Sequence, residues 1–248
     1  MSDQGKEDGK RLLILASYGM EIVECGGTAM VHVDQGWEVH SAVVLCRPEN
    51  KGYVEEAAMH MGITVEFLEY RMGEMGLTKE DRAPLIRAIR RYRPSTVVLY
   101  DPEHSWTDLD PERRVLSLLF LEALSLCGRD TFPELGQPHT VGSVYYMSPE
   151  RPNCVVDITS KHRRKMEALA MLRYQMERSG SDLMQRYGGS VFEALDARDP
   201  GDDYGRGLFL LGMGETGHSL HFGLGEPGSR PLVERFRKGG LFVLKEFE

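Results

Sequence analysis

Short apolar runs alternate with amphipathic segments along the first half of the chain. Four β-prone runs have the length and character of buried parallel strands: 11–17, 37–46, 63–68 and 95–100. Four helices are predicted over 25–36, 53–61, 78–93 and 111–127, from helical periodicity or, for the first, from the small residues Gly26, Gly27 and Thr28 at its start. This alternation predicts an α/β fold, a Rossmann-like parallel sheet flanked by helices.

Local signals at the ends of these segments support the predicted helices. Thr78 and Asp81 have the spacing of a capping pair, Gly62 suits a helix C-cap, and Pro111 suits a first helical turn. In doubly wound folds the active site lies at the carboxyl ends of the strands. Those ends are expected at 17–24, 47–51, 70–75 and 101–110.

The second half of the chain follows a different pattern. Residues 140–147 and 153–158 are β-prone and predict a hairpin, and Thr159 is placed to cap a long helix that runs to about Tyr187. The glycine-rich stretch after residue 200 predicts loops with short strands, a small C-terminal β/loop region. We therefore expect three parts: a disordered tail, an α/β domain and an extension packed on it, at 1–9, 10–199 and 200–248.

Composition narrows the function classes. The 248 residues carry a formal charge of −8, with 30 basic and 38 acidic side chains, which argues against nucleic acid as a partner. Mean hydropathy is −0.35 and no apolar run reaches the roughly 20 residues of a membrane span. The polar N-terminus does not resemble a secretory signal. The four cysteines are widely spaced, which favours reduced thiols and a cytoplasmic protein. The sequence leaves open whether the chain forms a homo-oligomer.

An ordered set of motifs resembles the LmbE-like family, which comprises the N-acetylglucosaminyl-phosphatidylinositol de-N-acetylases and related bacterial amino-sugar deacetylases. The matching segments are Glu21-Ile-Val-Glu-Cys-Gly-Gly-Thr28, Arg93-Pro94 with Val97-Val-Leu-Tyr-Asp101-Pro102, Asp110-Pro-Glu-Arg113-Arg-Val115 and Pro152-Asn-Cys-Val-Val-Asp157-Ile-Thr159. Each segment is weak alone, but their order over roughly residues 10–195 is specific. The resemblance implies a Rossmann-like fold and, for the family, zinc-dependent N-deacetylation.

The chain departs from the family where the zinc chemistry resides. In the family motif P-H-P-D-D-E, the His and the second Asp bind zinc and the first Asp is the general base. The motif H-P-D-H supplies the third ligand. By the resemblance, the three ligand positions fall on Ser17, Met20 and Arg113, and the base falls on Gly19. An assisting histidine falls on Asp110.

These residues suit zinc poorly. Zinc takes Cys, His, Asp or Glu ligands, and an arginine has no lone pair to offer. We therefore expect no zinc cofactor and no family activity. The main hypothesis is a non-hydrolytic homologue, a partner or regulator, or a protein that binds a small polar or anionic, sugar-like ligand. The alternative is a hydrolase (an N-deacetylase of an amino-sugar conjugate) or a hydratase with a rebuilt active site.

Candidate ligand-binding residues lie at the predicted strand ends. Arg113 is either a salt-bridged surface arginine or a fixed cation in place of zinc that binds an anion. His104 is either a loop histidine or a relocated acid/base, and His139 lies near a position where family members carry His. A relocated metal site from Glu21, Asp101, His104 and Asp108 lacks supporting ligand spacing. The full candidate set is Ser17, Glu21, Asp101, His104, Asp110, Arg113 and His139.

Overall fold

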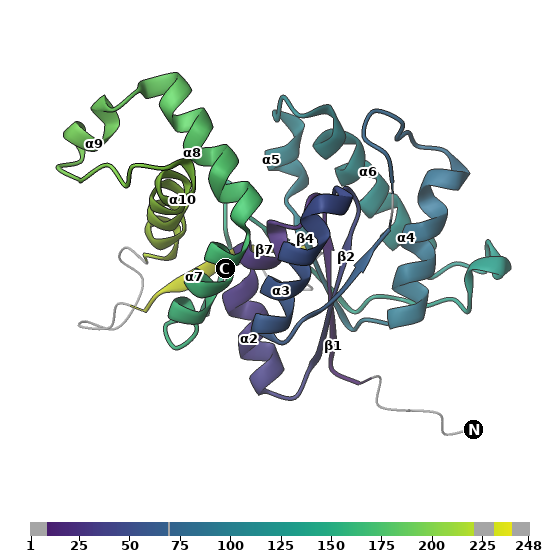
Figure 1. The fold of residues 1–248 in the computed structure, drawn as a ribbon. Helices are drawn as coiled ribbons and strands as arrows, with labels where there is room; N and C mark the ends of the chain where they lie inside the picture. The colour runs from purple at the N-terminus through teal and green to yellow at the C-terminus, as the bar shows by residue number, and fades with distance from the viewer. Residues whose placement is uncertain (1–8, 69, 221–230, 240–248) are drawn as a thin grey trace.

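A computed structural model describes residues 9–68, 70–220 and 231–239 (Figure 1). Its sheet has seven strands in the order β3-β2-β1-β4-β5-β7-β6, which confirms the predicted α/β class. The first five along this order are parallel, and β7 is antiparallel to both of its neighbours. The strands are β1 Arg11–Ala16, β2 Glu38–Val43, β3 Thr64–Phe67, β4 Thr96–Tyr100, β5 Ser143–Met147, β6 Cys154–Asp157 and β7 Val233–Lys238.

Helices cover both faces of the sheet because β1 is apolar on both sides. Leu12, Ile14 and Ala16 face one core with α1, α2, α3 and α7, whereas Leu13 and Leu15 face another with α4 and α6 (Figure 1). The helices of these two layers are α1 Glu21–Glu24, α2 Gly26–Asp34, α3 Lys51–Met61, α7 His162–Met171, α4 Lys79–Tyr92 and α6 Pro111–Leu126.

The predicted helix ends have clear physical causes. Thr78 and Asp81 form a reciprocal capping box at α4, and Gly62 ends α3 in the left-handed conformation with φ of 79°. Asp110 caps α6 by accepting hydrogen bonds from the backbone N–H groups of Glu112 and Arg113, with Pro111 in the first turn. Short turns of helix not foreseen in the sequence lie at α5 Pro102–Trp106, α9 Ser190–Ala194, η1 Pro48–Asn50 and η2 Pro133–Leu135.

The predicted hairpin between 140–147 and 153–158 is wrong. Strand β7 lies between β5 and β6, with Tyr146 opposite Arg237 and Val155 opposite Arg235. A strand from the far C-terminal part of the chain supplies the hydrogen bonds that the hairpin would have made. The C-terminal region therefore contributes to the main sheet.

The predicted helix over 159–187 is interrupted, and residues 203–219 of the glycine-rich region form a helix where loops were expected. One predicted short strand is present as β7, whereas 221–230 and 240–248 lie outside the described residues. Leu172, with ψ of 58°, separates α7 from α8 Arg173–Tyr187. Residues 203–219 form α10 Asp203–Ser219, which packs against α8 in the helical lobe at the upper left of Figure 1. The glycines allow this contact: a Cβ on Gly207 would lie 1.8 Å from the carbonyl oxygen of Met176.

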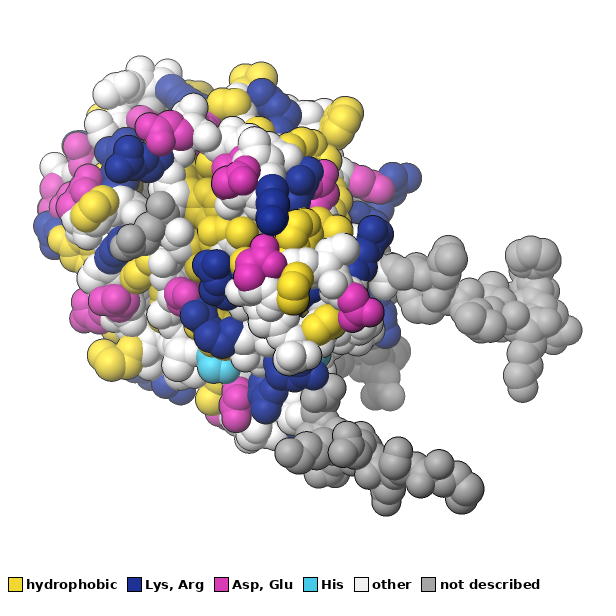
Figure 2. All heavy atoms as spheres, turned by 90° about the vertical axis from the view of Figure 1, so that its right-hand side faces the viewer, with side chains coloured by type: hydrophobic (Ala, Val, Ile, Leu, Met, Phe, Trp, Pro, Cys, Tyr) yellow, Lys and Arg dark blue, Asp and Glu magenta, His cyan; other side chains and the backbone are white. Residues whose placement is uncertain are grey.

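The surface carries both kinds of charged side chain that the composition contains. On the face in Figure 2, basic and acidic side chains are intermixed, with hydrophobic ones exposed between them. Within 9–68, 70–220 and 231–239, the helices lack the length and apolar character needed to cross a membrane. The expected disordered tail falls almost wholly on residues 1–8, outside the described part of the chain.

Candidate functional site

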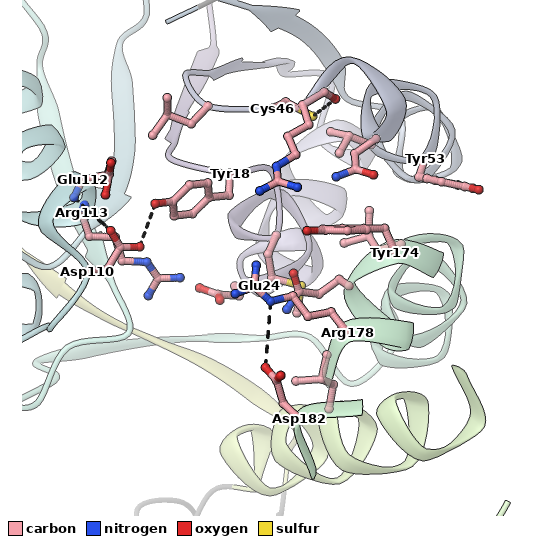
Figure 3. A pocket seen from close by; sticks show the side chains of 18 of the residues that line it. Tyr18, Glu24, Cys46, Tyr53, Asp110, Glu112, Arg113, Tyr174, Arg178 and Asp182 are labelled. Carbon is pink, nitrogen blue, oxygen red and sulfur yellow. Dashed lines mark hydrogen bonds and ion pairs between the residues drawn. The ribbon is translucent and has the colours of Figure 1, made fainter. Parts of the chain in front are cut away.

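A cavity of about 690 Å³ opens at the carboxyl ends of β1 and β2 (Figure 3). The loops after these strands form one wall, the first turn of α6 forms another, and α8 and α10 close the side away from the sheet. We call it the first cavity. Its polar and aromatic lining comprises Tyr18, Glu24, Arg47, Asn50, Tyr53, Asp110, Glu112, Arg113, Tyr174, Gln175, Arg178, Asp182, Glu215 and His218.

Glu21 builds the loop under this cavity. Its buried carboxylate accepts hydrogen bonds from the backbone N–H groups of Ser17 at 3.0 Å, Tyr18 at 3.2 Å and Gly19 at 3.0 Å. Both oxygens are therefore committed to the chain itself, which satisfies three donors that the tight turn would leave unpaired. Ser17 is also buried and is absent from the cavity lining.

Asp110 joins the start of α6 to the loop after β1. Besides capping the helix, it accepts a hydrogen bond of 2.7 Å from the hydroxyl of Tyr18. Desolvation opposes ionisation of this carboxyl, but the hydrogen bonds from Tyr18 and the backbone lower the pKa of Asp110 overall. Burial, with the nearby Asp110 charge, raises the pKa of the Tyr18 phenol. The pair therefore consists of a carboxylate and a neutral phenol.

Arg113 presents its side chain to the cavity. Its guanidinium carbon lies 5.9 Å from the ring centre of Tyr18 and 5.1 Å from that of Tyr100, and Nη1 is 3.4 Å from Asp108. Desolvation alone would lower the pKa of Arg113, but Tyr100 and the acidic groups Glu21 and Glu24 raise it overall. Arg113 is thus a permanently charged cation in the cavity wall.

The structure distributes the other candidate residues differently. Asp101 is fully buried and forms a bidentate ion pair with Arg237 of β7, at 2.7 Å for both contacts, so it does not face Arg113. His104 lies 3.3 Å from Glu150 and lines a second, adjacent cavity. His139 is buried before the amino end of β5, where its Nε2 lies 2.8 Å from the Pro94 carbonyl oxygen, and it lines neither cavity.

Sequence reasoning missed Glu24. Glu24 is absent from the predicted candidate set, yet it lines both cavities. Its Oε2 is inaccessible to solvent and has no hydrogen-bond partner in the described structure. Desolvation, then the charges of Glu21 and Glu215, raise the pKa of Glu24 to about 8. Glu215 comes from α10, almost two hundred residues along the chain, so no local signal could have found the pair.

The residues at the family metal position do not fit zinc. Met20 and Arg113 line the cavity with a thioether and a cation, Ser17 is buried beside it, and Glu21 is saturated by backbone donors. The relocated site is not formed either, because Glu21, Asp101, His104 and Asp108 each have separate partners. Across the described ranges, His, Cys, Asp and Glu side chains form no cluster of three suited to a metal.

Fold and site together define an α/β protein with a Rossmann-like sheet and a polar cavity at its carboxyl edge. A diacetylchitobiose deacetylase from Thermococcus kodakarensis is 26% identical over 130 residues, covering 50% of this chain and 48% of the relative. The chain thus spans about half the length of the curated relative it matches. A search for matching family models found none.

Solved structures share the fold over nearly the whole chain. An N,N'-diacetylchitobiose deacetylase from Pyrococcus horikoshii superposes with a TM-score of 0.65 at 20% identity, covering 94% of this chain and 85% of that one. A 4-carboxy-2-hydroxymuconate hydratase from Pseudomonas putida gives 0.64 at 18% identity, covering 96% and 100%. These likenesses show that the chain shares the α/β fold of these proteins. One fold thus carries two different reactions.

Proposed function

We propose that this chain is a divergent LmbE-like protein that binds a small polar ligand with an anionic group in the first cavity and does not perform zinc hydrolysis. The observation that carries the proposal is Arg113, whose cation lines the cavity beside the Tyr100 ring. By the motif resemblance, this residue falls at a family zinc-ligand position. A cation at this position repels a metal ion, and it attracts a carboxylate or phosphate.

The cavity supports this proposal beyond Arg113. Arg47 also lines it and has no ion pair within the described part of the chain. Tyr53, Tyr174, Asn50 and Gln175 add the mixture of aromatic faces and hydrogen-bonding groups that suits a sugar-like ligand. A volume of about 690 Å³ is in the range of small-molecule sites. A cytoplasmic location belongs to the proposal, because the four cysteines are free.

A second candidate function is a metal-independent enzyme, the rebuilt hydrolase or hydratase. The observation that favours it is Glu24, a carboxyl group beside the cavity whose pKa of about 8 suits proton transfer near neutral pH. Arg113 would then stabilise developing negative charge on the substrate. Release of acetate from N-acetylglucosamine conjugates by metal-free protein, lost in Glu24→Gln, would favour this candidate over simple binding.

The binding proposal is tested with a sugar phosphate and with zinc. By calorimetry in metal-free buffer, glucose 6-phosphate should bind wild-type protein and lose at least about tenfold in affinity in Arg113→Gln, since a charge-assisted hydrogen bond is lost. Arg163→Gln, at an exposed arginine of α7, is the control. Elemental analysis after dialysis against trace zinc should find far less than one equivalent per chain.

Two results would overturn the proposal. One is stoichiometric zinc that is lost on mutation of Glu21 or Met20. The other concerns glucose 6-phosphate and inorganic phosphate. The proposal is wrong if neither ligand binds wild type, or if each binds wild type and folded Arg113→Gln with the same affinity. Thermal unfolding of each variant establishes that it is folded.

A further inference from the structure

The first cavity meets a second cavity of about 460 Å³ at three shared residues, Glu24, Glu215 and His218. The second cavity lies between α10 and the end of β7, and its lining includes Tyr100 and His104. A ligand group at this junction therefore touches carboxyl groups from α1 and α10, in contrast to the arginines farther along the first cavity.

Lys165 of α7 supplies the nearest amino group, but its hydrogen-bonding capacity is already used. Its buried Nζ lies 2.8 Å from the backbone oxygen of Glu24, 2.8 Å from Oε2 of Glu215 and 2.8 Å from Oε1 of Glu234. An ammonium has three protons to donate, so none is left for the Glu24 carboxyl group. Glu234 is further satisfied by the N–H groups of Gly27 and Thr28 at 2.8 Å.

Glu24 is thus the acid at the junction that lacks a charged hydrogen-bond partner. In the described structure, its Oε1 accepts a hydrogen bond only from the Tyr100 hydroxyl, at 3.4 Å, and its Oε2 is inaccessible to solvent and has no hydrogen-bond partner. Oε1 of Glu215 likewise has no hydrogen bond within the described ranges, because Lys165 takes the other oxygen. Glu24 and Glu215 therefore both bring a carboxyl group to the junction, and burial makes the unpaired acceptor of Glu24 costly.

The groups around the junction leave an excess of negative charge. Glu21 and Glu24 of α1, Glu215 of α10 and Glu234 of β7 face the cations Lys165 and Arg113, with Tyr100 and His218 close by. Arg235 is a third cation, which lines the second cavity with its Nη2 3.0 Å from the backbone oxygen of His218. The four acids thus exceed these three cations by one, which a proton on Glu24 or a positive group of a ligand would balance. A metal ion is poorly served, because described His, Cys, Asp and Glu residues here form no metal-binding cluster.

We propose that Glu24 and Glu215 form a subsite for a primary ammonium group of the ligand, so that the ligand carries both an amine and an anion. The inference rests on the proposed function, which places the anion at Arg113. The ammonium would donate hydrogen bonds to the carboxyl groups of Glu24 and Glu215, which both line the junction of the two cavities. Without ligand, a proton on Glu24 serves the same purpose, in agreement with its raised pKa.

The test compares two sugar phosphates that differ by one group. Glucosamine 6-phosphate carries an amine where glucose 6-phosphate has a hydroxyl, so the ratio of their dissociation constants isolates the amine. In wild type the amine should improve affinity about tenfold or more, as a charge-assisted hydrogen bond does. In Glu24→Gln the preference should vanish while the affinity for glucose 6-phosphate stays within about twofold. Glu193→Gln, at an exposed position of α9 outside both cavities, should keep the preference.

A second measurement decides the subsite even if the anion site fails. If neither sugar phosphate binds, the proposed function is wrong, and the amine is then tested alone by thermal unfolding. Ethanolamine should stabilise wild type more than ethylene glycol, which has a hydroxyl in place of the amine, and Glu24→Gln should abolish the difference. The subsite is overturned if wild type shows no amine preference in the assay that binds, or if folded Glu24→Gln retains the preference.

Discussion

Individual residues around the first cavity owe their chemistry to how completely their polar atoms are paired. Glu21 and Glu24 are three positions apart on one short helix, yet Glu21 accepts three backbone hydrogen bonds and Glu24 keeps one oxygen unpartnered in the described structure. The first is therefore a structural carboxylate. The second is a titrating group whose charge is opposed by burial and by neighbouring acids.

Glu24 makes stability depend on pH. Its pKa is raised from about 4.5 to about 8 in the folded protein, so between these values the folded state binds a proton that the unfolded state releases. This contribution to the free energy of unfolding is present at low pH and is lost as pH rises toward 8. The free energy of unfolding of Glu24→Gln should therefore exceed that of wild type by on the order of 1–3 kcal/mol at pH 8.5, and by much less at pH 5.

Urea unfolding at the two pH values measures this gap. Glu55→Gln, at an exposed position of α3, is the control and should change stability little at either pH. A gap for Glu24→Gln that does not grow with pH would contradict the assignment.

Gly19, where the motif resemblance places the family's general base, has a backbone conformation that restricts its replacement. Its φ is +105°, and a Cβ would lie 2.9 Å from Cγ2 of Val54. Gly19→Asp should therefore destabilise the protein by about 1–3 kcal/mol. Gly73→Asp has a similar positive φ of +78° but open space around its Cβ, so it should cost less. Equal midpoints of chemical unfolding for the two variants would show that the Val54 side chain moves aside at little energetic cost.

At the scale of elements, α8 and α10 pack with their backbones almost in contact. A Cβ on Gly180 would lie 1.9 Å from the carbonyl oxygen of Asp203, and one on Gly207 would lie 1.8 Å from that of Met176. Glycine lowers helix propensity, but here it permits a helix pair that a larger residue would force apart. This pair positions Glu215 and His218 at the junction of the two cavities.

Two glycines of α10 should respond in opposite directions to alanine. Gly207→Ala must separate α8 from α10 and should cost several kcal/mol, measured as a lower free energy of unfolding. Gly217→Ala meets nothing within 4 Å and should be neutral or stabilise the helix by up to about 1 kcal/mol. Similar effects of the two substitutions would show that the close helix contact is not formed.

Across the whole molecule, Lys165 ties together elements that are distant in sequence. From α7 it contacts α1 through the Glu24 carbonyl, α10 through Glu215 and β7 through Glu234, which in turn binds the first N–H groups of α2. Desolvation opposes the charged form of Lys165, but Glu234 and Glu215 raise its pKa overall. The cluster is a buried ion network that joins the C-terminal elements to the sheet.

Lys165→Met should destabilise the fold by about 3–5 kcal/mol, because Glu215 and Glu234 would stay buried without a cation. Lys161→Met, which removes a partly exposed ion pair with Asp34, should cost at most about 1 kcal/mol. Denaturant unfolding of both variants gives the comparison. The network is unimportant for stability if Lys165→Met unfolds at the same denaturant concentration as Lys161→Met.

Local chemistry was enough to predict the N-terminal half of the fold. Apolar runs over 11–17 and 95–100, the Thr78 capping box and Pro111 in a first turn all act within a few residues, so their structural meaning is present in the sequence. The strand–helix alternation then implied the parallel order and placed Arg113 near the carboxyl ends of the strands. The motif order likewise sufficed to recognise the LmbE-like resemblance.

Only the tertiary structure decided which distant residues pair. Strand β7 takes the place that the predicted hairpin left to local pairing, and it pairs with β5 and β6 across about 75 to 95 residues, which no local pattern indicates. The helix α10 formed because its glycines fit against α8, a contact that composition alone cannot indicate. Asp101 forms an ion pair with Arg237, and Glu24 lies close to Glu215 and Lys165. These contacts span more than 130 residues of the chain. Burial and pairing set the charge of such groups, and both arise only when the chain is folded.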